Sequence, residues 1–137
     1  MADGLDETIL HLTWADFQWA IWSMADKVDR TRTRIYGVPR GGLCLAVALS
    51  HETGIPLAME PGPNMIVVDD IADSGKTIAE FKEAQRLVWV ARHPARHVAQ
   101  HVRLLPAGDD RWVLFPWEKE ENADTDRTGY ASRQRNL

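Results

Sequence analysis

Near its start the chain carries apolar residues at spacings of three and four, a pattern that predicts one amphipathic helix. The stripe consists of Trp14, Phe17, Ile21, Met24 and Val28. Thr13 is expected to cap this helix, because its side chain can accept a hydrogen bond from a first-turn amide and Asp16 can complete the reciprocal box. Trp19 and Trp22 widen the stripe and are expected to serve packing or subunit contacts.

Beyond residue 34 the pattern changes to short apolar runs separated by helical stretches. Continuous apolar runs are typical of strands covered on both faces, and they predict strands at residues 35–38, 55–59, 65–68, 87–91 and 112–115. Helices are expected at residues 42–53, where Gly54 ends the helix, and at about 75–86. This alternation predicts an α/β fold with a mostly parallel sheet and right-handed crossovers.

Composition and charge narrow the class of protein. The chain has 137 residues, of which 45% are hydrophobic and 26% charged, as expected for one globular domain. Its longest apolar run spans residues 43–49, far short of the roughly twenty residues that a membrane span needs. The net charge of −4 leaves no broad basic field, so we expect neither a membrane nor a nucleic acid as a partner.

Residues 1–118 are expected to form the folded domain. The remaining nineteen, 119–137, include eight charged side chains and few apolar ones, so we expect a mobile tail. The single cysteine, Cys44, has no partner for an intramolecular disulfide, and the chain opens with no leader-like segment, so we expect a cytoplasmic protein. Cys44 is expected to be a small, buried apolar residue of its helix rather than a nucleophile.

The most informative segment is residues 65–77, MIVVDDIADSGKT. Here a buried strand delivers two adjacent carboxylates, Asp69 and Asp70, to its carboxyl end, where ligands of open α/β sheets bind. Residues 74–77 then open a helix whose free amides and positive dipole end suit a phosphate. Because carboxylates can bind vicinal ribose hydroxyls and Mg²⁺, the segment predicts a sugar-phosphate site. Two solvated acids in a loop are the alternative.

Residues 75–77 also match the end of a nucleoside-triphosphate P-loop, GxxxxGK[ST]. That motif needs a glycine five residues before Gly75, and the chain has Asp70 there. A carboxylate at this position would repel the triphosphate oxygens. We therefore do not expect a P-loop kinase or ATPase.

A second candidate site lies in residues 36–42, YGVPRGG, where a strand ends in a glycine-rich turn before an apolar helix. Glycines let backbone amides approach an anion closely, and Arg40 adds charge-assisted hydrogen bonds. We interpret this turn as a pyrophosphate site, with a plain tight turn as the alternative. The bond between Val38 and Pro39 has a low cost for the cis form, and the sequence leaves its isomer open.

Three histidines, His93, His97 and His101, recur at the spacing of metal ligands on a helix. Pro94 argues against such a helix, and no Cys, Asp or Glu completes a ligand set at suitable spacing. We expect these histidines to lie on a solvated face.

The two loops resemble those of a known family, the type I phosphoribosyltransferases. Residues 67–77 are similar to the family's motif for phosphoribosyl pyrophosphate (PRPP), and residues 37–42 to its pyrophosphate loop. Residues 13–14 and 110–118 (DRWVLFPWE) are similar to the xanthine-guanine phosphoribosyltransferases of bacteria. The resemblance covers residues 13–118. It implies a mostly parallel central sheet with flanking helices and a minimal C-terminal hood.

The resemblance also implies roles for the matching residues. The ribose and 5′-phosphate of PRPP would be bound by Asp69, Asp70, Asp73, Ser74, Gly75, Lys76 and Thr77. Pyrophosphate would be bound by Pro39, Arg40 and Gly41. Mg²⁺ would be the cofactor, with Asp70 as its ligand. The purine would be bound by Trp112 through stacking, by the backbone of Val113, and by Arg92 at its six-position oxygen.

The implied reaction is displacement at the anomeric carbon of PRPP by a purine nitrogen, with pyrophosphate leaving. Arg40 would neutralise the leaving group with Mg²⁺, and Asp73 would accept a proton near the imidazole ring, so these two are the expected catalytic residues. A donor such as Arg92 at the six-position favours an oxo group over the amino group of adenine. We therefore expect a salvage enzyme for guanine, xanthine or hypoxanthine.

Two features depart from the family pattern. The family carries a long flexible loop between its second and third strands, whereas only residues 60–64 separate Met59 from Met65 here. So short a turn cannot form a lid against water, which leaves open slow transfer, PRPP hydrolysis, closure by another subunit, or binding without chemistry. Arg92 stands where the family usually has lysine, and its planar fork changes the contacts available to a base.

Two functions from different classes follow. One is a lid-less 6-oxopurine phosphoribosyltransferase, favoured by Arg40, Asp73 and Trp112. The other is a regulatory protein of the same fold that binds PRPP or a nucleotide without turnover, favoured by the short turn. The resemblance further implies a homodimer or homotetramer, with Trp19 and Trp22 available for subunit contact.

Overall fold

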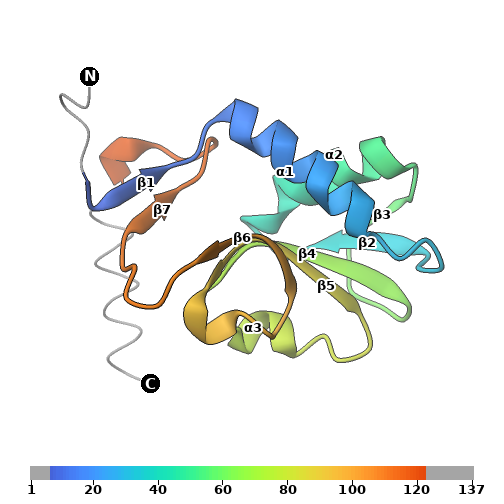
Figure 1. Cartoon of the computed structure of the whole chain (residues 1–137). Helices are drawn as coiled ribbons and strands as arrows, with labels where there is room; N and C mark the ends of the chain where they lie inside the picture. The colour runs from blue at the N-terminus through green and yellow to red at the C-terminus, as the bar shows by residue number, and fades with distance from the viewer. Residues whose placement is uncertain (1–6, 123–137) are drawn as a thin grey trace. The chain divides into compact units, whose positions relative to one another are not determined.

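The computed structural model describes residues 7–122. The chain divides into two compact units, which are described separately (Figure 1). The larger runs from Gln18 to Asp109, and the smaller combines the described residues up to Phe17 with those from Asp110 onward. Of the tail expected at 119–137, residues 119–122 include a 3-10 turn, Glu120–Asn122, and residues 123–137 lie outside the described residues.

The larger unit is built on a five-stranded sheet in which every strand pair is parallel. The strand order is β3-β2-β4-β5-β6. Their bounds are Arg34–Gly37 (β2), Leu57–Ala58 (β3), Met65–Ala72 (β4), Gln85–Arg92 (β5) and Gln100–Leu105 (β6). The α/β fold with a parallel sheet is thereby confirmed.

The strand order reverses between β2 and β4. The connection from β2 to β3 runs one way along the sheet and the connection from β4 to β5 runs the other. Right-handed crossovers therefore place α2 (Gly42–Thr53) and α3 (Lys76–Ala79) on opposite faces, as Figure 1 shows. In open sheets of this kind, ligands bind at the carboxyl edge beside such a reversal.

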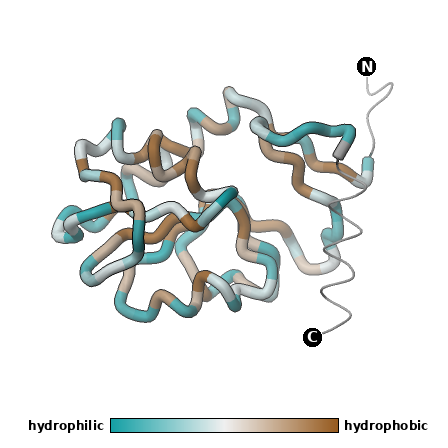
Figure 2. Tube along the Cα trace, turned by 180° about the vertical axis from the view of Figure 1, so that it is seen from behind, coloured by the Kyte–Doolittle hydropathy of each residue, from teal (hydrophilic) through white to brown (hydrophobic). Residues whose placement is uncertain are grey.

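The core of this unit lies on both sides of the central strands, where the apolar residues gather in Figure 2. In β4, residues 65–68 are all buried, and in β5 residues 87–91 are buried. Val67 and Val88 pack with Ile78 of α3 in one cluster, while α2 packs against β2 and β4 on the other face. Cover on both faces explains why these strands are continuously apolar instead of alternating.

The smaller unit holds the start of α1 (Trp14–Lys27) and a two-stranded parallel sheet of β1 (Ile9–His11) and β7 (Trp112–Leu114). The predicted capping box is confirmed. The Thr13 amide donates to Asp16 Oδ2 at 2.8 Å, and the Asp16 amide donates to Thr13 Oγ1 at 3.1 Å. Trp117 stacks on Phe115, with ring centroids 5.2 Å apart.

Several details differ from the prediction. The helix expected at about 75–86 is a single turn, α3, followed by turns in which the amides of Phe81 and Ala84 donate to carbonyls three residues back. The edge strand β6 and the strand β1 were not predicted, since both are short and mix polar with apolar residues. The strand predicted at 112–115 pairs with β1 and not with the larger sheet.

Two side chains expected to be buried are exposed. Cys44 is exposed on α2, because only one face of this helix meets the sheet and the buried residues Leu45, Ala46 and Leu49 occupy it. Trp14, predicted to lie on the buried stripe of α1, is 56% exposed.

His93 lies in the 3-10 helix η1 (His93–Ala95) and His101 in β6, so the three recurring histidines do not share a helix. No helix of the described chain is long and apolar enough to cross a membrane.

Candidate functional site

Asp69 and Asp70 lie within β4, which continues to Ala72, four residues further than predicted. Each carboxylate is held by the amide of the following residue. The Asp70 amide donates to Asp69 Oδ1 at 2.8 Å, and the Ile71 amide donates to Asp70 Oδ1 at 2.8 Å. Two half-buried carboxylates therefore stand side by side, in fixed orientations, near the carboxyl end of the central strand.

Both acids resist ionisation in the free protein. Burial, together with the charge of Asp70, raises the pKa of Asp69 to about 8. Burial also raises the pKa of Asp70 above its usual value. The cause is the same for both, since loss of solvation disfavours the charged form. A cation bound at the pair would favour the ionised form of both.

These shifts predict how the stability of the free protein depends on pH. Unfolded Asp69 ionises near its usual pKa of 3.8, whereas the folded carboxyl holds its proton up to about pH 8. The folded state therefore binds more protons between these values, and the stability that this contributes is present in acid and is lost as pH rises toward 8. We expect the Tm to fall between pH 5 and pH 8 more steeply in the wild type than in Asp69→Asn, as measured by calorimetry. Equal slopes in the two proteins would contradict the assigned environment of Asp69.

The predicted pyrophosphate turn, residues 39–41, connects β2 to α2. The Val38 amide donates to the Val68 carbonyl at 2.9 Å, which ties the entry of the turn to β4. The cis peptide bond lies between Pro39 and Arg40, one bond later than the position considered from the sequence. Arg40 itself is exposed.

The glycines of this turn let it lie directly against the acidic strand. A Cβ atom at Gly41 would collide with the carboxylate of Asp70, and one at Gly42 would collide with the carbonyl oxygen of Val68. Glycine is thus required here for close approach and not for an unusual backbone angle. The structure brings together the two loops that the sequence predicts separately.

The predicted phosphate loop follows β4. Gly75 has φ +86° and precedes α3, a conformation that favours glycine. The Lys76 amide donates to Ser74 Oγ at 3.3 Å, and the Ala79 amide donates to the Gly75 carbonyl at 2.9 Å. Ser74, Lys76 and Thr77 are exposed, so their side chains are accessible to a ligand.

Arg92 and Asp73, both expected near the base, form an ion pair. Arg92 is the last residue of β5, and its Nε donates to Asp73 Oδ1 at 2.8 Å, with side-chain exposures of 15% and 28%. Its Nη1 donates to the Asp109 carbonyl at 3.1 Å. The sequence analysis considered the two residues singly. The sequence signal that could have paired them is their position at the carboxyl ends of neighbouring strands: Asp73 directly follows β4 and Arg92 ends β5, and Ala72 pairs with Ala91.

The other two residues expected at the purine belong to the smaller unit. Trp112 is half-buried, pairs with Ile9 in the two-stranded sheet and packs against Ile9 and Leu114. Val113 is buried. All other predicted site residues lie in the larger unit.

The two carboxylates of β4 suit a Mg²⁺ ion that is also coordinated by a substrate. Residues 7–122 contain no group of three or more His, Cys, Asp or Glu side chains that could hold a metal ion. Mg²⁺ is usually held by one or two carboxylates and completes its coordination with waters and substrate phosphates. Asp69 and Asp70 supply such a pair.

The fold of this chain is similar to that of several solved structures. No family model matches the chain. A purine phosphoribosyltransferase from Pyrococcus horikoshii OT3 is similar, with 29% identity and a TM-score of 0.66, over 82% of this chain and 95% of that one. A xanthine-guanine-hypoxanthine phosphoribosyltransferase from Helicobacter pylori is 17% identical, with a TM-score of 0.64, over 86% and 99% of the two chains. A hypothetical protein from Neisseria gonorrhoeae with bound ppGpp is 17% identical, with a TM-score of 0.57, over 90% and 97%.

Proposed function

We propose that this chain, which has the type I phosphoribosyltransferase fold, transfers the phosphoribosyl group of PRPP to a 6-oxopurine and releases pyrophosphate. The observation that carries the proposal is the packing of the glycine turn against Asp70. A turn suited to a diphosphate and a strand end suited to a ribose are adjacent, as they must be for a substrate in which these groups share one bond. The similarity to the Pyrococcus purine phosphoribosyltransferase supports a purine as the acceptor.

In this proposal each loop binds one part of PRPP. The carboxylates of Asp69 and Asp70 accept hydrogen bonds from the ribose hydroxyls. Residues 74–77 bind the 5′-phosphate, and Pro39, Arg40 and Gly41 bind the diphosphate. Asp70 would also hold Mg²⁺, which supplies charge neutralisation for the leaving group.

The chemical step breaks the bond between the anomeric carbon and the diphosphate oxygen and forms a bond from that carbon to the purine nitrogen. Arg40 stabilises the negative charge that develops on the diphosphate. Asp73 accepts the proton that the purine nitrogen loses, and its ion pair with Arg92 fixes the orientation of its carboxylate. No covalent intermediate with the protein is needed.

In the larger unit, base recognition is proposed for Arg92. The resemblance separately implies that Trp112 of the smaller unit stacks on a flat base and that the backbone of Val113 contacts the edge of a base. Arg92 uses one guanidinium nitrogen for Asp73 and another for Asp109, and a guanidinium carries five N–H donors. A charged guanidinium donor favours an oxo group over an amino group at the six-position of the base.

Replacing Arg92 by glutamine is expected to lower kcat/KM for guanine and hypoxanthine about a hundredfold, because a charged donor is lost. The value for adenine should fall much less. Steady-state assays with each base measure this, and Arg92→Lys, which keeps a charged donor, should retain part of the preference. An equal fall in kcat/KM for all bases would show that Arg92 acts only by orienting Asp73.

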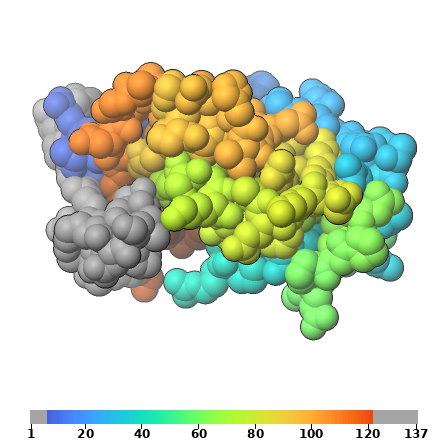
Figure 3. Space-filling view, turned by 90° about the horizontal axis from the view of Figure 1, so that it is seen from below, coloured from blue at the N-terminus to red at the C-terminus, as the bar shows by residue number. Residues whose placement is uncertain are grey.

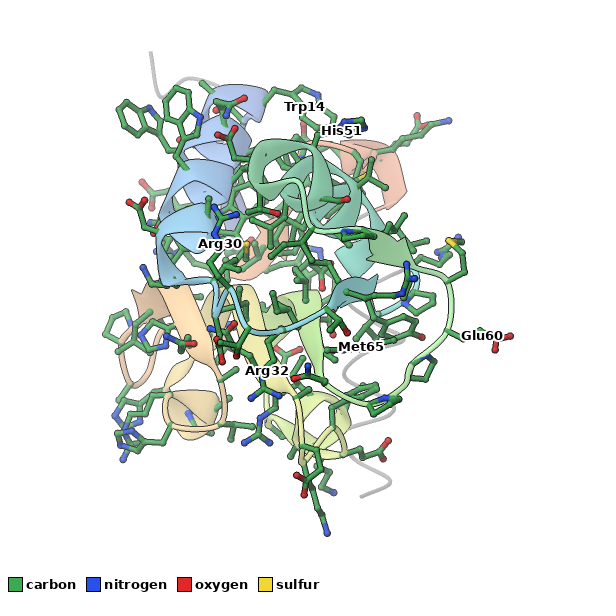
Figure 4. The ribbon with its side chains drawn as sticks, turned by 90° about the vertical axis from the view of Figure 1, so that its right-hand side faces the viewer. Trp14, Arg30, Arg32, His51, Glu60 and Met65 are labelled. Atoms are coloured by element: carbon green, nitrogen blue, oxygen red, sulfur yellow. The ribbon has the colours of Figure 1, made fainter. Side chains whose placement is uncertain are left out.

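A second candidate function is binding of PRPP or a nucleotide without turnover. It is favoured by the short connection between β3 and β4, residues 59–64, in which Glu60 points away from the body in Figure 4. So short a turn cannot cover a reacting centre. The Neisseria protein with bound ppGpp indicates that proteins of this fold include nucleotide binders.

Incubation with PRPP, Mg²⁺ and one purine at a time distinguishes the two candidates. The enzyme proposal predicts nucleotide and pyrophosphate in equal amounts from at least one of guanine, xanthine and hypoxanthine, far less of both from adenine, and loss of both products in Arg40→Ala. Absence of nucleotide from every base, with PRPP still bound, would establish the binding protein instead.

A further inference from the structure

A groove of about 440 Å³ lies at the amino ends of β5 and β6. Because all strands of the sheet are parallel, this edge is opposite to the carboxyl edge that carries Asp69 and Asp70. The lining residues are Ala84, Gln85, Arg86, Arg96, His97, Val98, Ala99, Gln100 and His101. Figure 3 views the surface on which the segment leading into β5 and the segment before β6 lie side by side.

The lining is basic although the chain as a whole carries a net charge of −4. It holds two guanidinium groups, two imidazoles and two side-chain amides, and none of the described residues that line it is acidic. Ala84, Val98 and Ala99 add an apolar wall. A groove of this composition suits a molecule that is anionic at one end and apolar at the other.

Hydrogen bonds hold the polar groups of the groove in place. Arg96 Nη1 donates to the His93 carbonyl at 2.8 Å, and Arg86 Nη1 contacts the Ala79 carbonyl at 3.4 Å. Neither guanidinium forms an ion pair with an acid in the part of the chain that the structure describes. Their remaining donors are available to a ligand.

The histidine and glutamine side chains are held by the surrounding structure. His101 Nδ1 is buried and has no hydrogen-bond partner among residues 7–122. Gln85 Nε2 donates to Gln100 Oε1 at 2.8 Å and to the Lys27 carbonyl at 2.7 Å. These bonds fix the two ends of the strands that form the groove.

We propose that this groove is a second binding site, separate from the carboxyl edge, for a phosphorylated small molecule. Guanidinium groups bind phosphate through paired, charge-assisted hydrogen bonds. The volume lies within the usual range of about 300 to 1,000 Å³ for sites that bind small ligands. The apolar wall accommodates the sugar or base of a nucleotide.

Two residues of the groove also contact α3. Val98 packs against Gly75 at the start of that helix, where a Cβ atom on the glycine would lie 2.7 Å from Val98 Cγ2. Arg86 contacts the carbonyl of Ala79 at its end. A ligand that draws Arg86 toward its phosphate would therefore act on the end of the helix, and one that displaces Val98 would act on its start. That this alters PRPP affinity rests on the proposed function, whereas binding in the groove does not.

Nuclear magnetic resonance of the full chain tests the binding, with tripolyphosphate and ATP as probes at 0.1 M salt and without Mg²⁺. We expect saturable shifts of the His97 and His101 ring signals and no shift for His51, which lies on α2 outside the groove. Tighter binding of ATP than of tripolyphosphate would identify a nucleotide as the ligand class, and equal binding an inorganic polyphosphate.

Matched variants distinguish specific binding in the groove from nonspecific electrostatic attraction of an anion to the protein surface. Arg96→Gln is expected to weaken binding at least tenfold, and Arg96→Lys, which keeps the charge, to weaken it less. Arg103→Gln removes an exposed charge from β6 outside the groove and should have no effect. Thr77→Ala, at the proposed 5′-phosphate site, should leave unchanged the ligand-induced shifts of the His101 ring signals. Absence of saturable shifts, or equal weakening by Arg103→Gln, would overturn the proposal whatever the enzyme assay shows.

Discussion

Replacing Asp69 and Asp70 together by asparagine is expected to lower kcat/KM for PRPP by at least about a thousandfold. Loss of a single preorganised electrostatic contact commonly costs about 10² to 10³ in rate. Here both carboxylates that are proposed to orient the ribose are lost, and the proposed Mg²⁺ ligand is lost with them. The measurement is the initial rate of pyrophosphate release at saturating purine.

The same double variant should not be less stable than the wild type. Burial raises the pKa of both acids, so their charged forms are disfavoured in the folded state and neutral amides avoid that cost. We expect the free energy of unfolding at pH 8 to be unchanged or higher. Glu60→Gln is the matched control, because Glu60 is exposed on the β3–β4 turn, and its rate should equal that of the wild type. Full activity in the double variant would show that PRPP is bound elsewhere.

Gly41→Ala is expected to reduce kcat/KM for PRPP about a hundredfold. The new methyl group would occupy the space of the Asp70 carboxylate, and this carboxylate can move only by losing its hydrogen bond from the Ile71 amide. A displacement of about 1 Å at a reacting group can cost this much in rate. Overpacking should also lower the free energy of unfolding by about 1 to 3 kcal/mol. Chemical denaturation and the transfer assay measure the two effects.

Gly62→Ala is the control for this substitution. Gly62 lies in the β3–β4 turn, and a Cβ atom there would meet only the flexible end of Met65, at 3.2 Å. Its activity and stability should be close to those of the wild type. If Gly41→Ala were as active as Gly62→Ala, the contact between the pyrophosphate turn and Asp70 would have no part in the reaction.

The parallel sheet, and the position of the two glycine-containing loops that follow β2 and β4, could be predicted because their signals are local. Four buried apolar residues followed by two acids mark a central strand and the direction of its carboxyl end, and the bounds of α2 follow from an apolar run that ends at Gly54. The capping box of α1 is likewise contained in four residues. Each of these features depends on neighbours in sequence and not on the tertiary fold.

Features that depend on tertiary neighbours were not predicted. The helix after Gly75 ends at Ala79 because the chain turns back to begin β5 at Gln85, two residues earlier than expected. The edge strand β6 lacks a continuous apolar pattern, since an edge strand is partly solvated. The pairing of Asp73 with Arg92, and the basic groove, arise only where strands far apart in sequence meet.

Calorimetric titration of the full chain with PRPP in the presence of Mg²⁺ tests the central claim, that the carboxyl edge of this sheet is a PRPP site. The account predicts saturable binding of one PRPP per chain, abolished by the Asp69→Asn/Asp70→Asn double variant, weakened by Arg40→Ala and unchanged by Glu60→Gln. Absence of saturable binding, or equal affinity in the double variant, would contradict it.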